Sequence, residues 1–91
     1  MKFKKVEQLA NNQFLIKFDK GEIFQSYNSV VAMKYYDSDI LYLYKDYDYS
    51  VTTSKYLKKC FGFSAKDCTL ALERKDKNFV YNENITHNRH S

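Results

Sequence analysis

The sequence contains no proline, no tryptophan and only two glycines among its 91 residues. With so few conformational breakers, its turns must be formed by Asp, Asn and Ser, whose side chains hydrogen-bond to nearby backbone groups. No apolar run approaches the roughly 20 residues that a membrane-spanning helix needs, and residues 1–7 are too polar to begin a signal peptide. We therefore expect a cytoplasmic protein, in whichever cell makes it, that does not contact a membrane.

Residues suited to catalysis or metal binding are also scarce, with two cysteines and two histidines in the chain. Cys60 and Cys68 are expected to be reduced and buried, as is usual in the cytosol. A thiol nucleophile needs a neighbouring base, but His87 and His90 lie near the end of the chain. The aspartate pairs within residues 37–39 and 46–48 lack the glycine and glutamate of a calcium-binding loop, and no phosphate-binding glycine loop is present. The sequence therefore predicts a protein that is not an enzyme and that binds no metal or cofactor.

The composition favours a single folded domain, since 44% of the residues are hydrophobic and 18% are aromatic. Eight of the nine tyrosines lie between Tyr27 and Tyr56. We expect the folded domain to span residues 1–81, and residues 82–91, which lack a hydrophobic period, to form a loose tail. The net charge of +4 permits contact with nucleic acid without requiring it.

Alternating apolar residues predict β-strands in the first half of the chain. Phe14, Ile16 and Phe18 share one face of a strand at residues 13–18. A tight turn, with Gly21 available for a positive φ, leads to the partner strand. The other strands are predicted at residues 23–27, 30–36 and 40–44, with a helical turn as the alternative for 30–36, and residues 2–6 form either a short strand or an ordered lead-in.

Residues 53–61 carry the helical pattern around which the rest of the chain is organised. The hydroxyl side chains at residues 50–54 can cap the start of this helix, and Gly62 stands where helices commonly end. At about 100° per residue, four apolar side chains share one face, and we expect this face to pack on the sheet. These four are Tyr56, Leu57, Cys60 and Phe61.

Three lysines, Lys55, Lys58 and Lys59, fall on the opposite face of this helix. A row of lysines is commonly the solvated face of a small domain, and it can also contact nucleic acid or an acidic partner. The sequence leaves both interpretations open. The helix therefore offers one apolar face to the core and one basic face to solvent or a partner.

Residues 64–81 fit two alternative structures. In the first, Ser64 caps a second helix and Asp67, three residues on, completes a capping box. In the second, residues 68–73 form a strand that turns back into a strand at residues 79–81. We favour the helix. The fold class predicted is then α+β, with a small antiparallel sheet of three to four strands packed against one or two short helices.

Tyrosines alternate with aspartates in the loop formed by Asp46, Tyr47, Asp48 and Tyr49. Tyrosines of this kind are ordinarily half-buried packing residues of a sheet, and that remains the alternative. In a loop, exposed tyrosines supply rigid contact area, and the acids complement a basic partner. We expect Tyr47 and Tyr49 to be exposed, and the four residues together to bind a partner protein.

Two segments carry a resemblance to known proteins. Residues 24–32 read Phe-Gln-Ser-Tyr-Asn-Ser-Val-Val-Ala, and residues 48–57 read Asp-Tyr-Ser-Val-Thr-Thr-Ser-Lys-Tyr-Leu. This pattern resembles a group of small, largely uncharacterised proteins from phages and other mobile elements of low-GC bacteria. The resemblance covers roughly residues 13–62 and transfers no functional residue.

The resemblance implies a context rather than an activity, because a family or fold does not fix a function. Compact phage proteins of this size often bind and block a host machine, so it implies an anti-CRISPR-type inhibitor, with a CRISPR–Cas effector as the leading target. The partner would then be a host protein or ribonucleoprotein complex. The alternative is a nucleic-acid-binding accessory protein that uses Lys55, Lys58 and Lys59, and a third possibility is a small structural or regulatory phage protein. The oligomeric state is left open.

Overall fold

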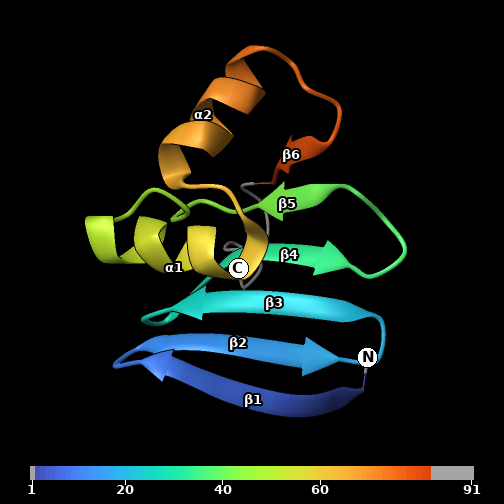
Figure 1. Ribbon diagram of the computed structural model, residues 1–91, viewed down its shortest axis with the longest axis vertical. Helices are drawn as coiled ribbons and strands as arrows, with labels where there is room; N and C mark the ends of the chain where they lie inside the picture. Colours follow the sequence, from blue (N-terminus) through green and yellow to red (C-terminus); the bar gives the residue numbers. More distant parts are fainter. Residues whose placement is uncertain (1, 83–91) are drawn as a thin grey trace, which may run out of the picture.

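One six-stranded sheet with two helices beside it makes up the structure, a computed structural model that describes residues 2–82 (Figure 1). The order of the strands across the sheet follows their order in the sequence. The predicted tail, apart from Asn82, lies outside the described residues, as do His87 and His90. In chain order the elements are β1 (Phe3–Ala10), β2 (Gln13–Phe18), β3 (Gly21–Ser26), β4 (Ser29–Tyr35), β5 (Leu41–Leu43), α1 (Val51–Phe61), α2 (Ala65–Glu73) and β6 (Phe79–Tyr81).

Strands β1 to β5 form an antiparallel meander, whereas β6 lies parallel to β5. Antiparallel neighbours need only short turns, but a parallel neighbour needs a longer crossover, which α1 and α2 supply. The predicted α+β class with short helices is therefore confirmed. The predicted sheet of three to four antiparallel strands is too small, because residues 3–10 form a full edge strand and residues 79–81 add a sixth strand.

Gly21 allows the backbones of β3 and β4 to approach closely. A Cβ atom at this position would overlap the backbone oxygen of Lys34. The expectation of a positive φ at Gly21 is wrong, because the positive φ angles of the described residues occur at Gly62 and at three other residues. Those three are Asn12, Tyr27 and Lys75.

Helix α1 begins after Ser50, one of the four hydroxyl residues predicted as possible caps, and it ends at Phe61, with Gly62 as the predicted stop. Ser50 Oγ accepts a hydrogen bond from the Thr53 N–H at 3.1 Å, which satisfies a donor that the first helical turn leaves free. Gly62 adopts the left-handed conformation with a φ of 88°, and its N–H donates to the Lys58 carbonyl. Because Ser50 is the cap, the helix starts at Val51, slightly earlier than predicted.

Residues 64–81 form both a helix and a strand. Ser64 Oγ accepts from the Asp67 N–H at 3.2 Å, and the Asp67 carboxylate accepts from the Ser64 N–H at 3.0 Å, so the predicted capping box is confirmed. These hydrogen bonds lower the pKa of Asp67. The alternative strand at residues 68–73 is wrong, because α2 occupies that stretch. The strand expected at residues 79–81 does exist, but it pairs with β5.

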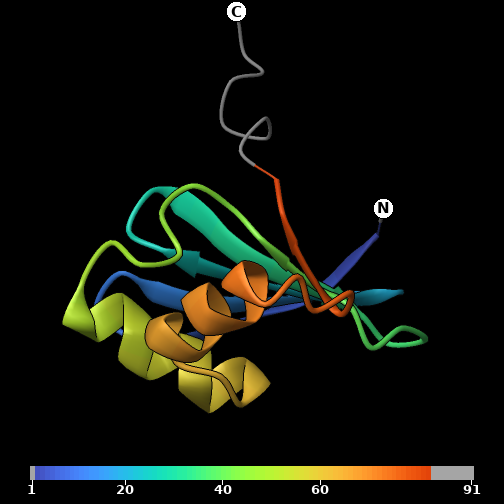
Figure 2. The same cartoon turned by 90° about the horizontal axis from the view of Figure 1, so that it is seen from above.

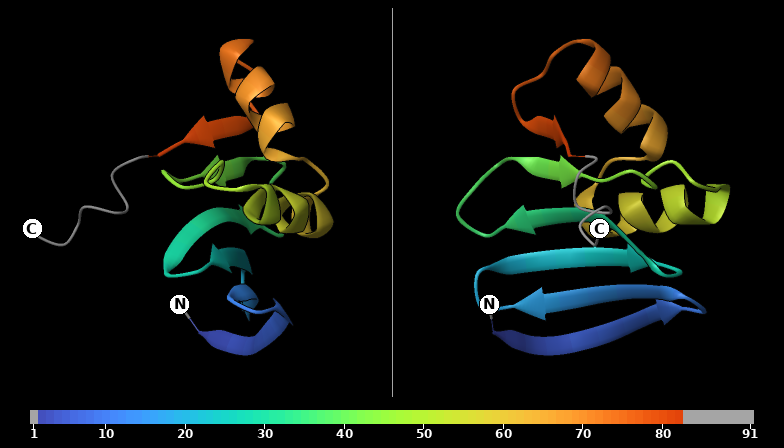
Figure 3. Two further views of the ribbon diagram at one scale, coloured as in Figure 1. Left: turned by 90° about the vertical axis from the view of Figure 1, so that its left-hand side faces the viewer. Right: turned by 180° about the vertical axis from the view of Figure 1, so that it is seen from behind.

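Both helices lie on one face of the sheet, and the main core fills the space between them and that face (Figures 2 and 3). Leu57 of α1 is fully buried there, while Tyr56, Cys60 and Phe61 are partly buried against the core. The predicted apolar stripe of α1 is therefore confirmed. The buried members of this core are Phe24, Val31, Ala32, Leu41, Leu43, Tyr47, Leu57, Ala65 and Cys68.

The strand register shows which face the helices cover. Leu15, Phe24, Ala32 and Leu43 stand opposite one another across β2 to β5, on the side of the core. Since side chains alternate along a strand, Phe14, Ile16 and Phe18 of β2 point to the other face, away from the helices. The helices therefore cover the less apolar face of β2.

Replacing Leu57 with Ala should lower the free energy of unfolding by about 2–5 kcal/mol, because the change leaves a cavity at a fully buried position. Chemical denaturation of purified protein measures the loss. Val51→Ala serves as the control, because Val51 lies on the same helix with 88% of its surface exposed. Equal shifts for the two variants would show that α1 does not dock through Leu57.

Candidate functional site

The loop after β5 places the four predicted partner-binding residues in three different environments. Asp46 is half-buried, Asp48 is exposed, and Tyr49 is 67% exposed. Tyr47 is only 7% exposed, so the prediction that it would be accessible is wrong. The segment is a loop, as predicted, but one of its tyrosines belongs to the core.

Tyr47 is buried because both parts of its side chain find partners inside the molecule. Its hydroxyl forms a hydrogen bond of 2.7 Å with Thr69 Oγ1 of α2, and its ring packs edge-to-face on Tyr81, with 6.1 Å between the ring centroids. A buried tyrosine is stable where its hydroxyl has such a partner. Tyr47 therefore fixes the loop to α2 and β6.

Tyr49 forms an exposed aromatic pair with Tyr27, a residue that was not predicted to belong to the site. The two ring centroids are 5.8 Å apart at an interplanar angle of 66°. Tyr27 is 41% exposed and lies in the turn between β3 and β4. The sequence feature that could have indicated Tyr27 is its position at the tip of a predicted hairpin, because turn positions ordinarily favour small polar residues.

Tyr27 occupies a backbone conformation that a bulky residue rarely adopts, with a φ of 56°. Two hydrogen bonds hold it there: its N–H donates to the Asn12 carbonyl at 2.6 Å, and its carbonyl accepts from Gln25 Nε2 at 3.0 Å. Residues held in such conformations are concentrated at functional sites. The fold thus keeps a strained tyrosine at the surface.

A cleft of about 190 Å³ lies beside this aromatic pair. The Asp46 carboxylate lines the cleft and accepts a hydrogen bond from Ser29 Oγ at 2.8 Å. No lysine or arginine within residues 2–82 forms an ion pair with Asp46. The cleft is lined by Ser26, Tyr27, Asn28, Ser29, Asp46, Tyr49 and Thr53.

Buried hydroxyl groups connect the two sides of this cleft. Ser26 Oγ of β3 and Thr53 Oγ1 of α1 form a buried hydrogen bond of 2.8 Å. Thr53 Oγ1 also lies 3.1 Å from Ser50 Oγ, in a second hydrogen bond. Because Ser26 precedes Tyr27 and Tyr49 precedes Ser50, this network holds the two rings at a fixed separation.

The three lysines of α1 are exposed, as the helical pattern predicted. Lys55 Nζ lies 5.4 Å from the centroid of the Tyr56 ring, and Lys59 Nζ lies 6.0 Å from it. These distances fit cation–π contacts, which hold the two ammonium groups beside one ring. Lys58 stands in the last turn, where a positive charge suits the helix dipole.

Neither cysteine is activated as a nucleophile. Burial raises the pKa of the Cys60 thiol to about 11 and that of Cys68 to about 12, so both stay protonated near neutral pH. Among residues 2–82, no three or more His, Cys, Asp or Glu side chains are arranged to hold a metal ion.

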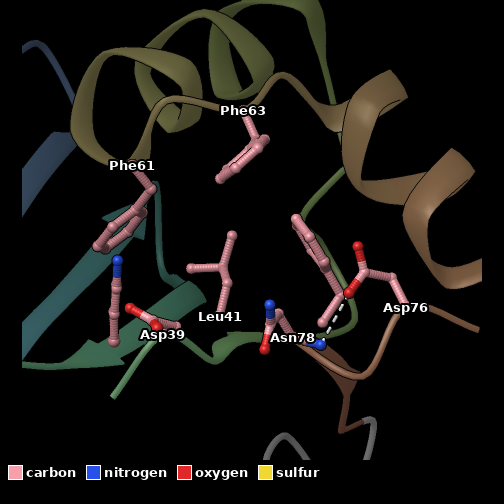
Figure 4. A pocket seen from close by; sticks show the side chains of 8 residues that line it. Asp39, Leu41, Phe61, Phe63, Asp76 and Asn78 are labelled. Atoms are coloured by element: carbon pink, nitrogen blue, oxygen red, sulfur yellow. Dashed lines mark hydrogen bonds between the residues drawn. The ribbon is translucent and has the colours of Figure 1, made fainter. Parts of the chain in front are cut away.

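A second hollow, of about 330 Å³, lies between the end of α1 and strands β5 and β6 (Figure 4). Phe61, Phe63 and Leu41 stand around it as an apolar wall, and the Phe63 ring packs edge-to-face on Phe79, with 5.0 Å between the centroids. Its described lining has no histidine, cysteine or hydroxyl group. Its polar rim consists of Lys34, Asp39, Asp76 and Asn78.

The fold and these surfaces define a small α+β protein with an exposed pair of tyrosines beside a polar cleft that contains the Asp46 carboxylate. The chain belongs to DUF8033, a family of unknown function, whose model matches residues 1–79. No curated protein and no solved structure matches the chain. Within residues 2–82, no helix is long and apolar enough to cross a membrane.

Replacing Tyr47 with Phe removes its hydroxyl and keeps its ring. We expect the free energy of unfolding to fall by about 0.5–1.5 kcal/mol, the usual net value of one hydrogen bond. Tyr49→Phe is the matched control, because its hydroxyl makes no hydrogen bond within residues 2–82. Urea denaturation of both variants measures the difference, and equal stability for the two would contradict the role given to the Thr69 contact.

Proposed function

We propose that this protein is a non-enzymatic binding protein that recognises a protein partner through the Tyr27–Tyr49 surface. This surface consists of the two tyrosine rings and the carboxylates of Asp46 and Asp48. The observation that carries the proposal is the exposed, fixed pair of rings beside a carboxylate that has no ion pair within residues 2–82. Tyr47 does not face the partner. Its contacts with α2 and β6 hold the loop that carries Asp46, Asp48 and Tyr49 in place.

The two tyrosines suit a contact surface because of their size and fixed positions. Each ring offers a large apolar area with few rotatable bonds, so little conformational entropy is lost on binding. Tyrosine is also enriched among the residues that contribute most to binding energy. Both rings are already ordered against each other before any partner binds.

The chemistry of the cleft favours a basic group of the partner. The Asp46 carboxylate is half-buried and has Ser29 Oγ as its hydrogen-bond donor, and it forms no ion pair with a lysine or arginine among the described residues. An arginine or lysine side chain would satisfy this carboxylate and contact the face of an aromatic ring at the same time. Asp48, which is exposed, would add attraction at longer range.

For the biological role, we propose inhibition of a host defence complex, with a CRISPR–Cas effector as the first target to test. The support is the resemblance of residues 24–32 and 48–57 to small proteins of phages and mobile elements. The partner in this case is a host protein or a ribonucleoprotein complex. Its basic protein surfaces would meet Asp46 and Asp48.

The binding proposal is tested by capture of partners from host cells with wild-type protein and two variants. We expect Tyr49→Ala to lose the captured partner by faster dissociation, and Asp46→Lys to lose it by slower association. The controls are Tyr36→Ala, at a tyrosine that is 60% exposed elsewhere, and Asp37→Lys, at an exposed aspartate. Quantitative mass spectrometry identifies the partner, and denaturation confirms that each variant folds.

The same variants separate binding from inhibition. In cells that carry an active CRISPR–Cas system, the wild type and the two control variants should block interference, while Tyr49→Ala and Asp46→Lys should not. If folded Tyr49→Ala and Asp46→Lys proteins capture partners as well as the wild type does, the Tyr27–Tyr49 surface is not the contact surface. If the wild type captures a partner but blocks no effector, the inhibitor role is wrong and the binding role stands.

A second candidate function is nucleic-acid binding through the basic face of α1. It is favoured by the two lysines that flank the half-buried Tyr56 ring, since a cation and an aromatic ring together suit a phosphate and a stacked base. Reversing the charges of Lys55, Lys58 and Lys59 should abolish binding to labelled duplex or single strand. Wild-type affinity should also fall steeply with added salt. An absence of binding at near-physiological salt would reject this alternative.

A further inference from the structure

The sheet has an apolar row on the face that points away from the helices. Each strand contributes one residue to it, and the strand register places each residue directly opposite the next. Within residues 2–82, no helix covers this face (Figures 2 and 3). From β1 to β6 the row consists of Val6, Ile16, Ile23, Met33, Tyr42 and Val80.

The neighbouring row, on the helix-facing side, is charged over the first four strands. Lys5, Lys17, Glu22 and Lys34 stand opposite one another there, directly beside the residues of the apolar row. A two-layer α+β protein ordinarily turns its polar residues toward solvent on the open face of its sheet. Here these four charged residues point toward the helix side, and the row beside them on the open face is apolar.

The side chains of the open face form an ordered layer of their own. The rings of Phe18, Tyr35 and Tyr42 pack edge-to-face in sequence, with 6.1 Å between successive centroids. Phe18 is 2% exposed and Ile23 is 9% exposed, although neither belongs to the core under the helices. The middle of this face is therefore closely packed, while Val6 and Val80 at the two ends of the row are 61% and 37% exposed. No second layer among the described residues covers it.

We propose that a second copy of this chain covers the open face, so that two sheets pack face to face as a β-sandwich dimer. The six residues of the row carry no charge, so the row is complementary to itself, and a two-fold axis brings the same patch of both copies together. Six strands about 4.8 Å apart and about five residues long give the open face of one copy a footprint on the order of 500 Å². Two copies would bury about 1,000 Å², which reaches the lower limit of a specific interface.

The proposed dimer uses a different surface from the proposed function. The cleft beside Tyr27 and Tyr49 is lined by Ser26, Ser29 and Thr53, which belong to the helix-facing side of the molecule. The open face lies on the other side of the sheet. Loss of the dimer and loss of partner capture are therefore separate results, obtained with separate variants.

Sedimentation equilibrium of the full chain over a range of concentrations tests the proposal. We expect wild-type protein to approach twice the chain mass of 10.9 kDa as concentration rises. Met33→Lys, at the centre of the row, and Val6→Lys, at its exposed end, should each weaken dimerisation at least about tenfold, because they place an unpaired charge in the interface. Val51→Lys is the matched control, since Val51 is 88% exposed on α1, and it should dimerise like the wild type.

Val6 keeps the test decisive if Met33→Lys does not fold, because Val6 is 61% exposed and tolerates a lysine in the isolated chain. Circular dichroism and denaturation verify the fold of each variant. A wild type that stays monomeric at all concentrations overturns the proposal. If that monomer loses its captured partner on Val6→Lys, the open face binds the partner instead. The proposal is also overturned if Val51→Lys disrupts the dimer while Val6→Lys leaves it intact.

Discussion

The docking of α1 on the sheet is the interaction on which the rest of the structure depends. Leu57 enters the core that Phe24, Ala32 and Leu43 build on the sheet, and the buried hydrogen bond between Thr53 and Ser26 fixes the start of the helix over β3. The apolar contact supplies most of the stabilisation, since burial of a large side chain outweighs one hydrogen bond. The hydrogen bond adds direction, which apolar contacts lack. Together they determine where the segments before and after α1 can lie.

The aromatic pair follows from this arrangement. Tyr49 precedes the cap of α1 and Tyr27 follows the strand residue that bonds to the helix, so docking of α1 brings the rings together. The loop between β5 and α1 is also held by Tyr47, which reaches α2 and β6. A loop anchored at both ends loses little freedom when a partner binds, which is the condition for tight recognition by a small surface.

The two faces of the sheet give the molecule two sides with different properties. One side carries the helices, the lysines of α1 and the cleft with Asp46, while the other carries an uncharged apolar row. If both proposals hold, a dimer would present two copies of the Tyr27–Tyr49 surface at once. Two linked sites bind a repeated or large target more tightly than one site does, without any new contact.

The sequence by itself determined the local elements. The alternation in residues 13–18, the cap and stop of α1, and the capping box of α2 all depend on residues a few positions apart, so they could be predicted from spacing. The apolar stripe of α1 was predicted for the same reason. Of the candidate site, the loop and its exposed Tyr49 were predicted, because an alternation of tyrosine and aspartate is polar enough to indicate a surface segment.

Only the tertiary structure decided how these elements combine. Period-two alternation gives a strand two faces, but it does not state which face a helix will cover, and here the more apolar face of β2 stays open. The burial of Tyr47 depends on Thr69, and the pairing of Tyr49 depends on Tyr27, both distant in sequence. The parallel pairing of β6 likewise depends on the path of two helices. Such contacts join residues that are far apart in the sequence, so they form only when the whole chain folds. A local sequence pattern therefore does not predict them.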